Sequence, residues 1–394
     1  MKLLLGLILV FSAITHSQAQ SDLVPTNLTS ITEGAVSNRF QNHMWVTGDG
    51  RFHLLFNNGE TRDALEIYSS FDGVDWQLTK IMRRSRSTST GDGVLVGDYL
   101  YIVYPLKQNE INLTILEYQR DRGRWKTRLE STVLTSETTA FDRPSIAVDS
   151  RGRIWISATA TRNGNSAIQI FAMEDSQSEL QWIAQPGSIN TSAQRSARLI
   201  ATDGILALVF TDNPGTSSEE FELNFIYRPD HLNARSGWTH PQRLIAYSSS
   251  ENDRYGTHFN CATDLNGNIH VLTRRGDELM YIKIANLSIA FNTPRPIFTG
   301  ELAPYSQISV DQNNRIYALC PIKEGNLQNI EILSSENGGA TFEPFESLIA
   351  HKTSQQSPLR IQAPGRIQER LPILVFTKLG EGLRQLIGTL LETD

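Results

Sequence analysis

Cysteine is almost absent from this chain of 394 residues, which contains only Cys261 and Cys320. Two cysteines cannot staple a chain of this length, so a disulfide-dense scaffold is excluded. Both lie in apolar, strand-like stretches, and they form either a single disulfide or two buried free thiols. The motifs CxxC, HExxH, GxSxG and the P-loop are absent too, so we expect neither a metal ion nor a cofactor.

Long hydrophobic runs are missing beyond the N-terminus. Residues 3–10 are apolar and follow Lys2, and small residues stand at Ser17 and Ala19. This run is far shorter than the ~20 residues of a membrane span, and the pattern is typical of a cleavable signal peptide. We therefore expect a signal peptide at 1–19 and one mature domain at 20–394, secreted or periplasmic, with no membrane span.

An excess of positive charge is also missing, because the formal net charge is −6 at pH 7. This balance argues against nonspecific nucleic-acid binding. No stretch longer than about 10 residues shows a convincing helical period. The chain is therefore expected to be built of strands, and we expect it to be monomeric.

One sequence pattern recurs along the chain: an apolar strand, a turn of Asp, Gly or Asn, and a second strand with aromatic or β-branched residues. A third alternating strand follows each copy of it, and a short fourth strand usually comes next. This pattern predicts an all-β, seven-bladed β-propeller of four-stranded antiparallel blades; an elongated β-solenoid fits the hairpin turns poorly. The second strands contain these residues, 47 to 63 positions apart: His53, Tyr101, Trp155, Ala207, His270, Tyr317 and Ile373.

The two ends of the chain complement each other. The seventh unit stops without a fourth strand, and residues 22–32 look like an orphan fourth strand. Pairing the two would close the ring and remove both open sheet edges. We therefore expect the N-terminal strand to complete the last blade.

Two turns between third and fourth strands follow a pattern of Ser, Asp or Asn, Gly and an aromatic. They contain Ser335, Asn337, Gly339, Thr341 and Phe342 and, one residue shorter, Ser70, Asp72, Gly73 and Trp76. The pattern resembles the Asp box, or BNR repeat, of sialidase-like propellers, where it is a folding device remote from the active site. We expect the Asp or Asn to accept backbone N–H groups, the Gly to take a positive φ and the aromatic to pack between sheets.

Residues at or just before the first strand of each unit should surround the mouth of the central channel. Arginine recurs there and binds carboxylate or sulfate through paired hydrogen bonds. These arginines either bind an acidic glycan (sialylated, uronic or sulfated) or pair with loop Asp and Glu. Arg39 and Arg254 belong to this set, and from the mouth residues we assign the following to substrate binding: His43, Arg143, Arg195, Arg198, Tyr305 and Arg360.

Arg143 and Pro144 resemble part of the Arg-Ile-Pro signature of sialidases, without the Ile. The resemblance implies that Arg143 binds a carboxylate, that Asp92 is the acid and that Tyr255 or Tyr305 is the nucleophile. Sialidases are typically six-bladed, and the seven units counted here depart from that pattern.

The stretch 256–284 is similar to the His-containing repeat of propeller polysaccharide lyases such as ulvan lyases. The resemblance implies that Tyr255 and His258 move protons in a β-elimination. Arg274 and Arg275 would neutralise the uronate. His53 and His270 lie on second strands. A histidine at such a position is usually a half-buried residue of the strand and not a catalytic group.

The sequence thus predicts a carbohydrate-active protein that acts on an acidic glycan by hydrolysis or elimination. Its predicted catalytic residues are Asp92, Tyr255 and His258. The alternative is a noncatalytic propeller that binds a glycan or a protein through the same mouth.

Overall fold

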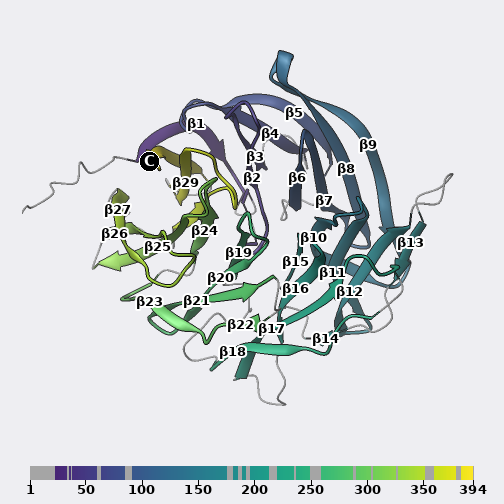
Figure 1. Cartoon of the computed structure of the whole chain (residues 1–394). Helices are drawn as coiled ribbons and strands as arrows, with labels where there is room; N and C mark the ends of the chain where they lie inside the picture. Colours follow the sequence, from purple (N-terminus) through teal and green to yellow (C-terminus); the bar gives the residue numbers. More distant parts are fainter. Residues whose placement is uncertain are drawn as a thin grey trace, which may run out of the picture.

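The computed structural model describes residues 23–32, 35–36, 38–59, 64–84, 91–174, 181–184, 189–191, 196–212, 220–234, 237–248, 259–286, 290–302, 305–324, 327–350, 359–378 and 383–393. The predicted signal peptide lies outside them. Seven antiparallel sheets follow one another around a ring (Figure 1), and we number them blades 1 to 7. The predicted seven-bladed, all-β propeller is confirmed.

The first three blades take up the N-terminal part of the chain. Blade 1 consists of β2 (Met44–Val46), β3 (Phe52–Phe56), β4 (Ala64–Ser70) and β5 (Gln77–Arg84). Blade 2 consists of β6 (Asp92–Val96), β7 (Tyr99–Lys107), β8 (Glu110–Gln119) and β9 (Arg124–Thr135), with a 3-10 turn, η1 (Arg120–Arg122), before β9. Blade 3 consists of β10 (Ala140–Val148), β11 (Ile154–Arg162), β12 (Asn165–Glu174), β13 (Gln181–Ala184) and β14 (Ile189–Thr191).

The next three blades repeat the same meander. Blade 4 consists of β15 (Ala197–Thr202), β16 (Ile205–Asp212), β17 (Glu220–Pro229) and β18 (Gln242–Ser248). Blade 5 consists of β19 (Phe259–Thr263), β20 (Ile269–Arg275), β21 (Glu278–Ala285), β22 (Ala290–Phe291) and β23 (Arg295–Thr299). Blade 6 consists of β24 (Gln307–Val310), β25 (Ile316–Glu324), β26 (Leu327–Ser335) and β27 (Glu343–Ala350).

Blade 7 joins the two ends of the chain. It consists of β28 (Arg360–Gln362), β29 (Arg370–Lys378), β30 (Arg384–Glu392) and, as its outermost strand, β1 (Val24–Ser30). β1 pairs antiparallel with β30, with Val24 opposite Gly388 and Ser30 opposite Arg384. The predicted closure by the N-terminal strand is confirmed, and it removes the free edges that an open sheet would present.

The core is divided among the contacts between blades. Seven clusters of buried apolar side chains occur, and each contains residues of two neighbouring blades. The alternating strands explain this arrangement, because each face of a blade packs against the next sheet. Cys261 and Cys320 belong to two of these clusters and are both free thiols. In the part of the chain that the structure describes, no helix is long and apolar enough to cross a membrane.

The Asp-box-like turns have the expected geometry. Asp72 Oδ1 accepts the N–H groups of Val74 and Asp75 at 2.9 and 2.8 Å, and Gly73 has φ +72°. In the second turn Asn337 Oδ1 accepts Thr341 N–H at 2.9 Å. Gly339 has φ +85°, and a Cβ there would lie 1.9 Å from the hydroxyl of Tyr281.

The aromatic residues of both turns pack as expected. Trp76 is buried between blades 7 and 1, and the ring of Phe342 meets Tyr281 of blade 5 edge-on at 4.9 Å. Each turn therefore places an aromatic ring against a neighbouring blade.

A second turn motif joins the first and second strands of three blades. In each, an Asp accepts backbone N–H groups of its own turn and also a ring donor six residues later. The pairs are Asp149 Oδ2 with Trp155 Nε1 at 2.9 Å, Asp264 Oδ2 with His270 Nε2 at 3.2 Å, and Asp311 Oδ2 with the Tyr317 hydroxyl at 3.2 Å. Trp, His and Tyr thus occupy equivalent positions, which identifies the ring as a stabilising element of the turn.

Candidate functional site

The channel through the ring has two ends. We call the end where the inner strands begin the mouth, and the end where they turn into the second strands the turn face. The segment Asn38–His43 leads from β1 at the rim to β2 at the centre (Figure 1). It makes a tight turn in which Gln41 N–H donates to Asn38 O at 3.0 Å, and Asn38 has φ +63°. We call Asn38–His43 the channel plug.

The plug is held by blades 2, 3 and 4 on one side. Its Asn42 N–H donates to Asp92 Oδ1 of blade 2 at 2.7 Å. Gln41 Nε2 donates to the carbonyl of Pro144 in blade 3 at 2.7 Å. Arg198 of blade 4 donates through Nη1 to the carbonyl of Phe40.

Blades 5, 6 and 7 hold the other side of the plug. The carbonyl of Arg39 accepts Asn260 Nδ2 of blade 5 at 2.7 Å and Gln307 Nε2 of blade 6 at 3.4 Å. His43 Nδ1 lies 2.9 Å from Gln362 Oε1 of blade 7. Since the plug continues directly into β2 of blade 1, all seven blades contact it.

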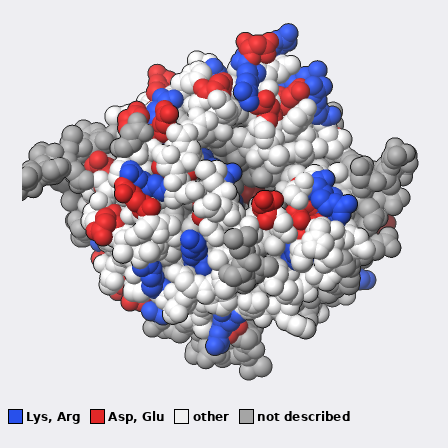
Figure 2. Space-filling model, viewed as in Figure 1, with Lys and Arg blue, Asp and Glu red and all other residues white. Residues whose placement is uncertain are grey.

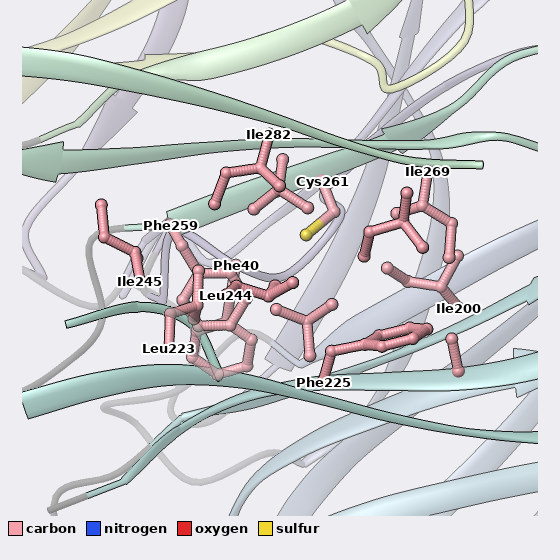
Figure 3. Close-up of a cluster of buried hydrophobic side chains, with 14 of the residues drawn as sticks. Phe40, Ile200, Leu223, Phe225, Leu244, Ile245, Phe259, Cys261, Ile269 and Ile282 are labelled. Carbon is pink, nitrogen blue, oxygen red and sulfur yellow. The ribbon is translucent and has the colours of Figure 1, made fainter. Parts of the chain in front are cut away.

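Phe40 anchors the plug on the far side of the ring. Its side chain is 0% exposed and belongs to the cluster between blades 4 and 5, opposite blade 1. Figure 3 shows Phe40 beside Phe259, Leu244 and Leu223, and its ring stacks on that of Phe259 with centroids 5.8 Å apart. The plug therefore spans the whole channel.

Asp92, the predicted acid, lies beneath the plug with 1% of its surface exposed. Besides Asn42 N–H, its carboxylate accepts the Ser145 hydroxyl at 2.7 Å and Ile146 N–H at 3.1 Å. Three donors, two from blade 3 and one from the plug, thus converge on one buried carboxylate. This geometry gives Asp92 a structural role, and its catalytic role stays a prediction.

His43 belongs to the plug and contacts Gln362, and Arg198 faces the plug rather than open solvent. Both are buried, and burial lowers the pKa of His43, although its hydrogen bond to Gln362 acts in the opposite direction. His43 is therefore neutral at physiological pH.

The predicted cationic residues that remain at the mouth are Arg143 and Arg360. Arg143 has φ +50° within a bulge of β10 and lies 3.8 Å from Asp142, measured from Nε to Oδ2. A non-glycine residue with this φ is uncommon, and bulges re-aim side chains near binding sites. Arg360 lies at the start of β28, with its guanidinium carbon 5.4 Å from the ring centre of Tyr305.

Tyr305 brings a second guanidinium into the same place. The guanidinium carbon of Arg39, in the plug, lies 3.6 Å from the ring centre of Tyr305. Two cations therefore share one aromatic ring at the mouth, an arrangement stabilised by cation–π attraction. We call Arg39, Tyr305 and Arg360 the Arg–Tyr–Arg cluster.

Several predicted residues lie outside the described part of the chain: Arg195, Arg254, Tyr255 and His258. Arg274 and Arg275 are described and contact their own hairpin. Arg274 Nε donates to Gly276 O at 2.6 Å, and Arg275 pairs with Glu278 at 2.7 Å. These contacts do not show a role in uronate binding for either arginine.

The histidines on second strands are buried in the blades. His53 Nδ1 accepts Trp125 Nε1 at 3.1 Å, and Nε2 lies 2.9 Å from the hydroxyl of Thr47. Nδ1 as acceptor leaves the ring proton on Nε2, so His53 is neutral. Burial lowers its pKa to about 3. His270 is likewise buried between Asp264 and Tyr281, and both are structural residues.

Beyond the plug, towards the turn face, the channel is hollow. A cavity of about 510 Å³ extends from Asn42 and Arg198 to the strand ends at Gly97 and Arg366. Its walls are mainly backbone and aliphatic side chains of the inner strands. The channel is thus closed at one end and open at the other.

Figure 2 shows how charged side chains are distributed on one face of the ring. On the face drawn in Figure 2, acidic and basic side chains are interspersed, with no large area of one sign. Among the described residues, no group of three or more His, Cys, Asp and Glu side chains is placed to hold a metal ion.

The plug could not be predicted from the sequence. Phe40, Gln41, Asn260, Gln307 and Gln362 were not expected to act together, and nothing local in the sequence links them. The one available signal was the polar residue that recurs near the start of the inner strands, as in Asp92, Ser145, Asn260 and Gln307.

No protein-family model matches the chain, and no curated protein matches it in sequence. Among solved structures, it is similar to the polysaccharide lyase Uly1, with a TM-score of 0.52 and 9% identity over 90% of each chain. It is also similar to AofleA from Arthrobotrys oligospora, with a TM-score of 0.50 and 8% identity over 84% of this chain and 94% of that one.

An α-L-arabinanase from Penicillium chrysogenum gives a TM-score of 0.49 and 12% identity over 94% of this chain and 98% of that one. At such identities the likeness concerns the fold alone. The chain is a seven-bladed β-propeller with a plugged channel, and membership in the sialidase-like family is not shown.

Proposed function

We propose that this protein is a secreted carbohydrate-active protein that engages an acidic glycan at the mouth of the propeller. The observation that carries the proposal is the convergence of cations there: the two guanidinium groups of the Arg–Tyr–Arg cluster and, across the ring, Arg143 in its left-handed bulge. Guanidinium groups bind carboxylate and sulfate in paired geometry. The fold it shares with a polysaccharide lyase supports the substrate class by analogy.

Catalysis in this proposal depends on Tyr255 and His258. In an elimination, a base removes the proton from the carbon next to the uronate carboxylate, the bond to the leaving oxygen breaks, and that oxygen takes up a proton. Arg143 or Arg360 would stabilise the charge that develops on the carboxylate. Secretion rests on the N-terminal pattern of residues 1–19.

A noncatalytic glycan-binding propeller is the second candidate, favoured by the hydrogen bonds of Asp92. Three donors occupy the carboxylate predicted as the acid, so one of the three predicted catalytic groups has a structural explanation. In this case Arg143 and Arg360 bind the glycan, and the protein does not catalyse its cleavage.

Binding is tested with the mature chain, polygalacturonate and its fully methyl-esterified form, which has the same backbone without the charge. We expect binding of the acid polymer, weakened by salt, and at least tenfold weaker binding in Arg143→Ala or Arg360→Ala. Arg124→Ala, an exposed arginine of β9, is the matched control and should bind normally. Equal binding of both polymers would refute the proposal.

Turnover is tested on the same samples by the ultraviolet absorbance of unsaturated uronate and by release from a fluorogenic sialoside. Absorbance that disappears in His258→Ala would support the lyase, and release lost in Arg143→Ala would support a sialidase. Binding without either signal would support the noncatalytic propeller for these substrates.

A further inference from the structure

The turn half of the channel has the size and shape of a ligand site. The cavity of about 510 Å³ falls within the usual range for small-molecule pockets, roughly 300–1,000 Å³. Val46, Val94 and Val148 are partly exposed and contribute aliphatic side chains to its wall, and Trp45 is among the lining residues. The plug closes its inner end, so the turn face is the way in.

The charged residues of the cavity lining are of one sign. Arg198 lies at the plug end and Arg366 at the turn face, and no Asp or Glu belongs to the described lining. This is notable in a chain with a net charge of −6. The turn carboxylates adjacent in sequence to the lining are Asp98, Asp149 and Asp264. Asp98 pairs with Arg120, and the other two already accept backbone and ring donors.

Arg198 is buried without a carboxylate partner among the described residues. It is 6% exposed, and its Nη1 donates to the plug at Phe40 O. Its buried Nε has no hydrogen-bond partner in the described structure. Burying a cation without an anion is costly, and an anion that reached this guanidinium would remove part of the cost.

We propose that the turn half of the channel binds a small organic acid, with its carboxylate on Arg198 and its apolar body along the aliphatic wall. Nη1 donates to the plug and Nε is buried, so the carboxylate would use Nη2, which has no hydrogen bond to a described residue. Arg366, exposed at the entrance, attracts the anion towards the cavity. This site is separate from the glycan site at the mouth, because the plug lies between them.

Calorimetric titration of the mature chain with hexanoate and phenylacetate tests the proposal, with hexanamide and phenylacetamide as neutral counterparts. We expect saturable binding of one or both acids, one molecule per chain, and at least tenfold weaker binding of the amides. Arg198→Met removes the charge and keeps much of the volume, and it should weaken binding of the acid at least tenfold. A change in the fluorescence of Trp45, absent in Trp45→Phe, would report binding inside the channel.

A second variant keeps the test decisive if Arg198→Met does not fold. Ala201 lies in the cavity wall near the turn face and is half-buried. Ala201→Leu should therefore fold, narrow the cavity near its entrance and weaken acid binding at least tenfold, while glycan binding at the mouth stays unchanged. Absence of saturable binding, equal affinity for acids and amides, or an undiminished affinity in folded Ala201→Leu would each overturn the proposal, whatever the glycan result.

Discussion

The two halves of the channel are built from the same seven inner strands and differ in almost every other respect. In the mouth half, polar side chains near the strand starts, such as Asp92, Asn260 and Gln362, point at the plug and are satisfied by it. In the turn half, aliphatic side chains and small residues surround open space. The chain fills one half with its own backbone and leaves the other half to solvent or a ligand.

This difference explains why polar residues in a channel are not sufficient evidence of catalysis. A backbone segment that crosses a ring exposes N–H and C=O groups, and these need partners once they are buried. Asp92, Asn260 and Arg198 supply those partners. Arg198 belongs to both halves, since it binds the plug and lines the cavity.

The largest expected effect comes from the anchor of the plug. Phe40→Ala should lower the free energy of unfolding by about 3–5 kcal/mol, because it removes a fully buried aromatic from the core between two blades. Urea denaturation measures the change. Phe71→Ala, at an exposed position, is the matched control and should cost far less. Equal costs would show that Phe40 does not anchor the plug.

The carboxylate beneath the plug should have the next largest effect. Asp92→Ala leaves three donors without their acceptor and should cost about 3 kcal/mol of stability. Asp92→Asn retains one acceptor oxygen and should cost less. A variant that loses turnover at unchanged stability would instead support the predicted acid.

Buried histidines in the plug and on second strands predict a loss of stability in acid. The pKa of His53 is lowered by burial from 6.5 to about 3, and burial also lowers the pKa values of His43 and His270. Between the ordinary pKa and the lowered one, the unfolded chain binds protons more readily than the folded chain. Stability therefore falls as the pH drops from about 6.5 towards 3.

For His53 the slope should reach about 1.4 kcal/mol per pH unit. Denaturation at a series of pH values measures it, and His53→Gln should flatten the curve. An unchanged slope in this variant would mean that His53 is not the neutral, buried group described here.

Much of the fold could be predicted from the sequence because a propeller is made of local repeats. Strand alternation, turn residues and unit spacing identified all seven second strands, from His53 in β3 to Ile373 in β29. The Asp-box-like turns at Ser70 and Ser335 were predictable in the same way, since their hydrogen bonds join residues at most a few positions apart.

The candidate site was less predictable because its contacts join distant positions. The strand starts were correctly expected to surround the channel, and Arg143, Tyr305 and Arg360 do lie near the mouth. Whether His43, Asp92 and Arg198 would face solvent or a plug depended on where residues 38–43 run. His43 and Gln362, which form one of the contacts, are 319 positions apart.

The sequence by itself determined the class of this protein: seven units, four strands in each, and an N-terminal strand to close the ring. These features follow from periodicity and turn chemistry, which act over a few residues. The tertiary structure decided which half of the channel is occupied. Only in the closed ring does Phe40 reach the core between blades 4 and 5, and that one contact divides the channel into a plugged mouth and an open cavity.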